Sequence, residues 1–282
     1  MHEKNKQIKL SMLGICYDRT QTFRKGAAAG PKILRAMFPK LETYISGIEL
    51  NDIFIKDIGN IRPKNEVELK SIERIIDKNA FLIMLGGEHT VSYPCIRALK
   101  PDVVVWLDAH PDCEASPFLS HNSVAAKLIE EGFELIFCGM RSCSKKEKEF
   151  MDKNRVKTIS LQALEKLGQK SIKLLQKKKW QHSSAQLKLA QAKRIYLSID
   201  FDVLDPSVIP WVGNPEPDGM QFKDVLRIVK ALAPKLIAID FVEYTPIDYA
   251  GKSKEGIIWN TIAAKLIYYS IAEVMASKGC KT

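Results

Sequence analysis

Apolar runs alternate with amphipathic stretches along nearly the whole chain. Continuous apolar runs, typical of strands buried in a sheet, occur near residues 9–15, 52–56, 81–85, 103–107, 135–139, 156–160, 195–200 and 236–242. Helical periodicity occurs near residues 31–37, 66–78, 91–99, 122–131, 144–153, 161–179, 221–233 and 256–276. Buried strands that alternate with helices form a parallel sheet with helices on both faces. The pattern therefore predicts an α/β fold with three layers, α/β/α, around a mostly parallel central sheet.

The length of the chain and the absence of linkers predict a single domain. At 282 residues the chain is long enough for one large core, and we assign residues 1–282 to one domain. No apolar run is long enough to span a membrane, and the first residues lack the apolar core of a signal peptide. The six cysteines have no paired spacing, which fits a reducing compartment. We expect a soluble, cytoplasmic protein without disulfides.

Acidic and imidazole side chains stand at the ends of three predicted strands. Six of them, four Asp and two His, are His89, Asp108, His110, Asp112, Asp200 and Asp202. Buried carboxylates are costly unless they are paired or bound to a metal ion. Mixed carboxylate and imidazole ligands without Cys favour Mn²⁺ over Zn²⁺, Fe or Co, and over Mg²⁺ or Ca²⁺. The first hypothesis is therefore a two-metal site that activates water for hydrolysis.

The spacing within each segment supports convergence on one pocket. Residues i and i+2 of an extended chain point the same way, so Asp108, His110 and Asp112 share a face if the strand geometry continues past Leu107. The alternative is that the Asp residues cap strand ends and the His residues are ordinary core groups. That alternative could explain any one of the three segments, but it does not explain why all three carry such residues at their strand ends.

Three segments resemble, in order and spacing, the signature motifs of the ureohydrolases, the family of arginase and agmatinase. The first motif, G-G-D-H-S, resembles Gly86–Thr90, with Glu88 in place of the usual Asp. The second, D-A-H-x-D, resembles Asp108–Asp112. The third, S-x-D-x-D-x-x-D-P-x-x-x-P, resembles Ser198–Pro210. The resemblance covers nearly the whole chain, and it implies an arginase-like fold, a homo-oligomer and two Mn²⁺ ions per chain.

The resemblance also implies a role for each of the six residues. His89 and Asp112 would bind one ion, and His110 and Asp202 would bind the other. Asp108 and Asp200 would bridge both ions. A hydroxide held between the two ions would attack the guanidinium carbon of the substrate.

Two further residues acquire roles in the same way. Glu243 matches the glutamate that pairs with the guanidinium of the substrate. A carboxylate can bind the planar guanidinium through two parallel hydrogen bonds. His121 matches the histidine that passes a proton to the leaving amine, which suits a group whose pKa lies near the working pH. A surface ion pair for Glu243 and a structural role for His121 are the alternatives. The neighbours of His121, Asn122 and Ser123, differ from the usual Gly-Thr.

The choice of substrate depends mainly on Glu114. Arginase-like sequences carry Asn at this position, whereas Glu114 would repel an α-carboxylate and could hold a distal ammonium. The stretch 214–219 also resembles the agmatinase branch more than arginase. We therefore expect hydrolysis of agmatine to putrescine and urea. Aminopropyl-agmatine, arginine and other guanidino or formimino compounds are alternatives, because the loop 113–120 is unlike the usual substrate loop.

Lys and Arg are concentrated in residues 163–194. This stretch contains nine Lys or Arg and one Glu, so it holds most of the formal net charge of +10. A basic helix beside Trp180 is compatible with a non-catalytic scaffold that binds nucleic acid, and this is the alternative from a different class of function. A solvated helical face is the more common reason for such a run. We therefore expect no nucleic-acid or membrane partner, and we place this segment away from a pocket for a cationic substrate.

Overall fold

The centre of the molecule is one eight-stranded sheet in a computed structural model that describes residues 8–169, 183–247 and 253–280. The strands lie in the order β4-β1-β5-β10-β9-β6-β7-β8, and every neighbouring pair is parallel. Their bounds are β1 Leu10–Ile15, β4 Ile55–Ile61, β5 Phe81–Gly86, β6 Val103–Leu107, β7 Leu135–Cys138, β8 Lys157–Thr158, β9 Ile195–Asp200 and β10 Leu236–Val242.

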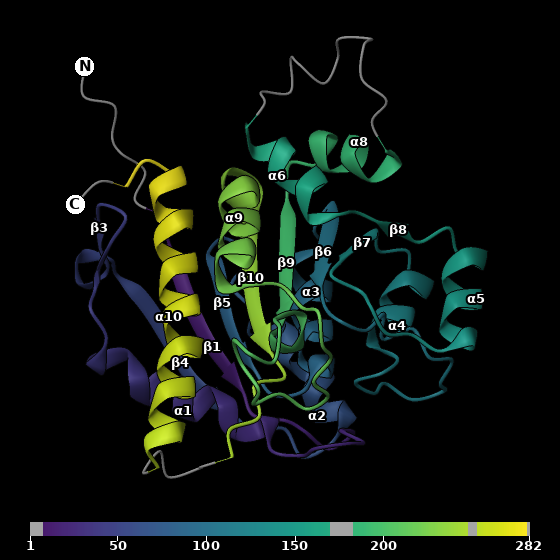
Figure 1. Cartoon of the computed structure of the whole chain (residues 1–282), viewed down its shortest axis with the longest axis horizontal. Helices are drawn as coiled ribbons and strands as arrows, with labels where there is room; N and C mark the ends of the chain where they lie inside the picture. The colour runs from purple at the N-terminus through teal and green to yellow at the C-terminus, as the bar shows by residue number, and fades with distance from the viewer. Residues whose placement is uncertain (1–7, 170–182, 248–252, 281–282) are drawn as a thin grey trace.

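Helices cover both faces of the sheet (Figure 1). One group, α1, α6, α8, α9 and α10, packs on one face, and α2 to α5 pack on the other. Their bounds are α1 Gly30–Met37, α2 Glu66–Ser71, α3 Ser92–Leu99, α4 Val124–Glu130, α5 Lys145–Lys153, α6 Leu161–Gln169, α8 Ser184–Gln191, α9 Phe222–Leu232 and α10 Lys254–Ser277. The predicted three-layer α/β/α fold with a parallel sheet is confirmed.

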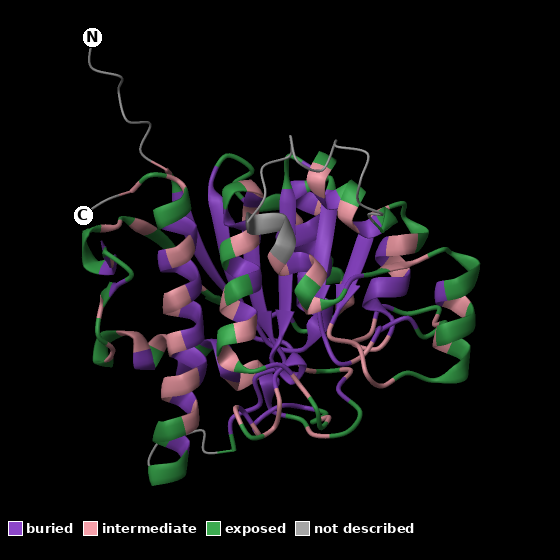
Figure 2. Ribbon diagram, turned by 45° about the horizontal axis from the view of Figure 1, so that its top comes forward, coloured by how far each residue is buried: buried purple, intermediate pink, exposed green. Residues whose placement is uncertain are grey.

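The strands are apolar at consecutive positions because each feeds two cores. In β5, Phe81, Ile83 and Leu85 point into the core shared with α9 and α10, whereas Leu82 and Met84 point into the core shared with α3. Figure 2 shows the central strands buried along their length between helices that are partly exposed. A sheet covered on both faces has no polar side, so continuous apolar runs identified its central strands.

Two strand bounds at the edges of the sheet differ from the prediction. The strand expected at 52–56 is β4, which begins at Ile55, because Leu50–Asp52 forms a 3₁₀ turn. The side chain of Glu49 caps that turn by accepting a hydrogen bond from the Asn51 N–H at 3.0 Å. The strand expected at 156–160 is only the two residues of β8. Edge strands are covered less completely, so their apolar pattern marks their ends poorly.

Two helices and one hairpin also differ. The helix expected at 66–78 ends at Ser71 and continues as a 3₁₀ turn over Ile72–Arg74. The helix expected at 161–179 is described as far as Gln169, and the rest of that prediction lies outside the described residues. A short antiparallel hairpin, β2 Tyr44–Ile45 with β3 Ile48–Glu49, was not predicted. Strands of two residues are too short to show a periodicity.

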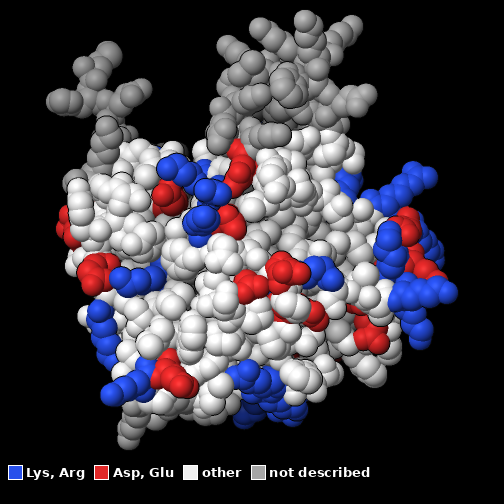
Figure 3. Space-filling view, viewed as in Figure 1, with Lys and Arg blue, Asp and Glu red and all other residues white. Residues whose placement is uncertain are grey.

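The surface and the cysteines agree with the composition. All six cysteines, which lie within the described residues, are free. Across the described chain, no helix has both the length and the apolar character needed to cross a bilayer. Figure 3 shows Lys and Arg interspersed with Asp and Glu over the described part of one face. In the basic segment, Lys188 of α8 lies 3.5 Å from a carboxylate oxygen of Glu134.

Candidate metal centre and active site

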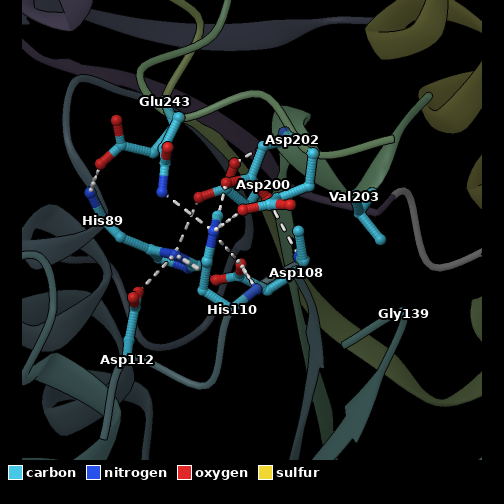
Figure 4. Close-up of polar contacts among 12 residues, drawn as sticks. His89, Asp108, His110, Asp112, Gly139, Asp200, Asp202, Val203 and Glu243 are labelled. Atoms are coloured by element: carbon cyan, nitrogen blue, oxygen red, sulfur yellow. Dashed lines mark hydrogen bonds and ion pairs between the residues drawn. The ribbon is translucent and has the colours of Figure 1, made fainter. Parts of the chain in front are cut away.

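Four neighbouring strands end around one site. β5, β10, β9 and β6 are adjacent and parallel, so their carboxyl ends meet at one edge of the sheet. Ligand sites of open parallel sheets lie beyond such ends. The side chains that follow these strands turn toward one another in Figure 4, and they include His89, Glu243, Asp200 and Asp108.

A glycine allows the first motif to turn sharply after β5. A Cβ on Gly87 would lie 2.0 Å from the carbonyl oxygen of Tyr17. That oxygen accepts a hydrogen bond from the Glu88 N–H at 2.7 Å, and the carbonyl of Gly87 accepts one from the Glu243 N–H at 2.7 Å. Only glycine permits so close an approach of the loop after β1. The turn therefore brings His89 and Glu243 to the same place.

The second motif converges on the site, but strand alternation is not the cause. The condition for strand alternation, a strand that continues past Leu107, is not met, because β6 ends at that residue. The His110 N–H donates a hydrogen bond to Asp108 Oδ1 at 2.6 Å, which turns the chain. Asp112 has a φ of +49°, in the left-handed region. An Asp side chain that accepts a nearby backbone N–H stabilises this type of turn.

The third motif turns in a similar way at the end of β9. Asp200 Oδ1 accepts a hydrogen bond from the Asp202 N–H at 2.7 Å and begins a 3₁₀ turn over Phe201–Val203. Asp202 Oδ1 in turn accepts a hydrogen bond from the Ala109 N–H at 3.0 Å. These bonds fix the loop after β9 against the loop after β6.

The side-chain donors gather around two points. His89 Nδ1 lies 3.1 Å from Asp108 Oδ2, 3.2 Å from Asp112 Oδ2 and 3.2 Å from Asp200 Oδ2. His110 Nδ1 lies 2.9 Å from Asp202 Oδ2 and 3.7 Å from Asp108 Oδ1. Two sets could each hold one metal ion, since the donor atoms within each set lie within 4.8 Å of one another: His89, Asp108 and Asp112, and Asp108, His110 and Asp202. Asp108 belongs to both sets.

The ring of His89 presents a lone pair to the first set. Its Nδ1 is buried without a hydrogen-bond partner among the described residues, and its Nε2 lies 2.9 Å from Ser198 Oγ. Ser198 donates its own proton to Asp240 Oδ1 at 2.7 Å, so it accepts from Nε2–H. In the neutral ring, Nδ1 is then unprotonated and faces three carboxylate oxygens. That arrangement is stable only with a cation between them, and a divalent metal ion fits.

His110 is oriented by the loop after the third motif. Its Nε2 lies 3.4 Å from Glu216 Oε1 and 3.0 Å from the side-chain amide of Asn214. These contacts leave Nδ1 directed at Asp202 and Asp108. A carboxylate behind a ligating imidazole fixes its orientation and increases its basicity.

Burial disfavours full ionisation of the carboxylate cluster. Burial, and then the charge of Asp108, raises the pKa of Asp112 to about 7. Burial and neighbouring carboxylates raise the pKa of Asp200 well above its usual range. Burial acts on Asp108 as well, but its contacts with the His110 and His89 imidazoles hold its pKa below the usual range. Divalent cations would neutralise these charges and allow all the carboxylates to ionise together.

Glu243 lies beside the cluster, and both of its carboxylate oxygens are bonded to the protein. Oε1 accepts a hydrogen bond from the His89 N–H at 2.8 Å, and Oε2 accepts one from Gln21 Nε2 at 2.5 Å. Burial, and then the charge of Glu88, raises the pKa of Glu243 well above its usual range. Because Glu243 is only 7% exposed, a surface ion pair is excluded.

His121 reaches the site from the loop before α4. Its Nε2 lies 3.2 Å from Thr22 Oγ1, and its N–H donates a hydrogen bond to Thr20 Oγ1 at 2.9 Å. Burial lowers the pKa of His121 to about 4. This pKa lies below the value near the working pH that is usual for a histidine. At pH 7 the ring is neutral and can accept a proton before it donates one.

A pocket of about 270 Å³ adjoins the cluster, a size that suits a small molecule. Glu243 and His121 line it together with Glu114 and Arg24. Asn122 Nδ2 donates a hydrogen bond to the carboxylate of Glu114. The described parts of the basic segment 163–194 contribute no residue to this lining.

The loop after β1 is the part of the site that the sequence analysis missed. Thr20 contacts His121, Gln21 contacts Glu243, and Arg24 lines the pocket. A signal was present, since the polar run 18–22 follows a buried strand just as the three motifs do. Applying the strand-end rule to every strand would have found it.

Comparison with known proteins adds the family. A model of the arginase family matches residues 8–271. The N(1)-aminopropylagmatine ureohydrolase of Thermococcus kodakarensis is 29% identical over 94% of this chain and 90% of its own length. The mitochondrial arginase of Medicago truncatula is 28% identical over 84% of this chain and 74% of its own. The crystal structure of agmatine ureohydrolase of Thermoplasma volcanium matches with a TM-score of 0.74 and 29% identity, covering 99% of this chain and 94% of that one. This chain belongs to the arginase family and is a hydrolase of that family.

Proposed function

We propose that this hydrolase binds two Mn²⁺ ions and releases urea from a guanidino compound, with agmatine as substrate and putrescine as the second product. The observation that carries the proposal is the buried Nδ1 of His89, which has no hydrogen-bond partner among the described residues and lies among three carboxylate oxygens. When bound, the two ions would supply hydroxide near neutral pH by lowering the pKa of water.

The proposed ligands follow the two sets of donor atoms. His89 and Asp112 would hold one ion, His110 and Asp202 the other, and Asp108 would contact both. Asp200 would join the first set through Oδ2, which lies 3.2 Å from His89 Nδ1. Its Oδ1 accepts the Asp202 N–H, so a bridging role for Asp200 requires that oxygen to use its second lone pair.

Glu243 would bind and orient the guanidinium. Each of its oxygens accepts one hydrogen bond from the protein and keeps a second lone pair for a substrate N–H. The bond from the His89 N–H fixes this carboxylate relative to a metal ligand. A guanidinium held by Glu243 would therefore have its carbon at a set place beside the cluster.

His121 would transfer the proton that the leaving amine requires. It lines the same pocket as Glu243, and its ring is neutral at pH 7 because burial lowers its pKa to about 4. A neutral imidazole can take a proton as the guanidinium carbon is attacked and then give it to the amine. Thr22 Oγ1, 3.2 Å from Nε2, would hold the ring in place.

Acidic side chains at the pocket favour a substrate with a cationic tail. Glu114 and Glu147 both line the pocket. Either carboxylate would attract the distal ammonium of agmatine and repel the α-carboxylate of arginine. A longer polyamine tail, such as that of aminopropyl-agmatine, carries a further positive charge and fits the same logic.

Arg24 favours a second candidate, a guanidino compound with an anionic tail. It lines the pocket, and its Nη2 is buried without a hydrogen-bond partner among the described residues. A carboxylate would satisfy that donor. Arginine and guanidinobutyrate are the compounds that this contact would select.

The test is urea release by the Mn-loaded protein from agmatine, aminopropyl-agmatine, arginine and guanidinobutyrate. We expect turnover of agmatine and little of arginine.

Two variants test the residues that would contact the substrate tail. Glu114→Gln should raise the KM for agmatine. Arg24→Gln should leave this KM unchanged or lower it, because a cation near the tail is removed. Preference for arginine or guanidinobutyrate, lost in Arg24→Gln, would support the second candidate. Absence of both urea and bound Mn²⁺ would contradict the proposal and favour the nucleic-acid scaffold.

A further inference from the structure

We propose that Glu88 is a positioning residue that acts through the loop after β1 on both groups assigned to the substrate. It is fully buried, with 0% of its surface exposed, and it belongs to neither set of metal donors. The proposal rests on the roles proposed above for Glu243 and His121. It adds an element, the loop 17–22, that none of the three motifs contains.

Four donors surround the carboxylate of Glu88. Oε2 accepts hydrogen bonds from the N–H groups of Thr20 at 2.8 Å and Gln21 at 2.9 Å. Oε1 accepts hydrogen bonds from the hydroxyls of Thr20 at 2.7 Å and Thr90 at 2.8 Å. The two N–H groups can only donate, and the two hydroxyls complete a set of four donors that an ionised carboxylate satisfies together. Three of the four bonds hold the loop after β1.

Each residue of the loop after β1 that Glu88 holds contacts Glu243 or His121. Thr20 Oγ1 donates to Glu88 and accepts the His121 N–H at 2.9 Å. The Gln21 side chain donates from Nε2 to Glu243 Oε2 at 2.5 Å, while its Oε1 accepts the Ala27 N–H at 3.4 Å. One buried carboxylate therefore fixes the loop that touches the carboxylate of Glu243 through Gln21, the backbone of His121 through Thr20 and the imidazole of His121 through Thr22.

The two threonines bonded to Glu88 Oε1 provide a matched test. Thr20→Val and Thr90→Val each remove one hydroxyl donor from the same oxygen with little change of shape. Thr20 Oγ1 also accepts the backbone N–H of His121. The Thr90 hydroxyl, by contrast, is bonded only to Glu88 among the described residues. Thr20→Ser keeps the hydroxyl and serves as the rescue variant.

We would measure bound Mn²⁺, the unfolding midpoint, and kcat and KM for urea release from agmatine. All three variants should retain two ions, and the two valine variants should lose similar stability. In Thr20→Val, kcat should fall at least about tenfold, since a misplacement of about 1 Å can cost more than that. In Thr90→Val and Thr20→Ser, kcat should stay within about twofold of the parent protein. Equal kcat in the two valine variants at equal metal content would overturn the proposal.

Crystal structures of the Mn-loaded variants separate this proposal from the proposed function. If the parent protein binds two ions but releases no urea from any of the four compounds, the proposed substrate class is wrong. The positioning role then depends on the structures alone. It predicts that His121 and Gln21 move in Thr20→Val and stay in place in Thr90→Val. Unmoved side chains in both variants would overturn it.

Discussion

At the scale of single residues, the partners of one imidazole nitrogen determine what the other can bind. His89 Nε2 is held by Ser198, and Ser198 by the buried Asp240. The Tyr196 hydroxyl also donates to Asp240 at 2.6 Å, so this carboxylate is fixed in turn. In the neutral ring, the chain of bonds leaves Nδ1 as the acceptor that faces the carboxylates.

Replacing Ser198 should weaken metal binding without unfolding the protein. Ser198→Ala frees the His89 ring to rotate and to change tautomer, and loss of such a partner costs about 10- to 100-fold in metal affinity. The affinity for Mn²⁺ is measured by isothermal titration calorimetry. Ser207→Ala is the matched control, since the Ser207 hydroxyl bonds to Asp205 on the surface. Equal affinity in the two variants would remove Ser198 from the account.

Glu243→Gln should keep the metal ions and lose turnover. The glutamine amide is neutral and can no longer form an ion pair with a guanidinium. Its NH₂ group would also face a hydrogen-bond donor, either the His89 N–H or Gln21 Nε2, in place of an acceptor. We expect kcat/KM for agmatine to fall by about 100-fold or more, the loss of a charge-assisted bidentate pair. Unchanged kinetics would exclude Glu243 from substrate binding.

The low pKa of His121 predicts a dependence of stability on pH. Burial lowers this pKa from 6.5 to about 4, so the unfolded chain binds a proton at a pH where the folded protein does not. The resulting stability is fully present above about pH 6.5 and is lost as the pH falls toward 4. Thermal unfolding of the Mn-loaded protein should therefore decline more steeply below pH 6.5 than that of His121→Gln. Parallel curves would show that the imidazole is not held neutral by the fold.

At the scale of elements, the turn after β5 joins three strands and carries the site. The backbone of Gly87 lies against Tyr17 after β1 and against Glu243 after β10. A single methyl group at this position has no room. The turn therefore couples the position of His89 to the loop that holds Gln21 and Thr20.

Gly87→Ala should lower both stability and metal affinity. Its Cβ would meet the Tyr17 carbonyl oxygen at 2.0 Å, and such overpacking costs about 1–3 kcal/mol. Gly132→Ala is the control, because its Cβ would meet nothing within 4 Å. Its φ of +87° is unfavourable for alanine, so this variant loses about 1 kcal/mol of stability through the backbone alone. The measurements are chemical unfolding and Mn²⁺ content. Metal content that falls equally in both variants would contradict a local role for Gly87.

The sequence predicted the elements that are buried on both faces and failed where burial is partial. β5, β6 and β9 follow from continuous apolar runs, and the residues at their ends identified the cluster of His and Asp side chains. The ends of β4 and β8 were misplaced because these edge strands have weaker patterns. The turns at Asp108 and Asp112 depend on side-chain hydrogen bonds and a left-handed residue, which apolar periodicity does not record.

At the scale of the whole molecule, the strand order assembles residues that are far apart in the chain. β10 lies between β5 and β9, so Glu243 enters between the segments that carry His89 and Asp200. Parallel strands place all of these ends on one edge. The contact between Gln21 and Glu243 spans 222 positions in sequence and exists only in this topology. The homo-oligomer that the family resemblance implies stays a prediction for light scattering to test.

The central claim is that the fold holds two Mn²⁺ ions beside a carboxylate for a guanidinium. The most direct measurement is anomalous diffraction at the manganese edge from crystals of the Mn-loaded protein. We predict two peaks per chain, one next to His89 Nδ1 with Asp112 and one next to His110 Nδ1 with Asp202, with Asp108 between them. A single peak, or peaks away from these two nitrogen atoms, would contradict the account.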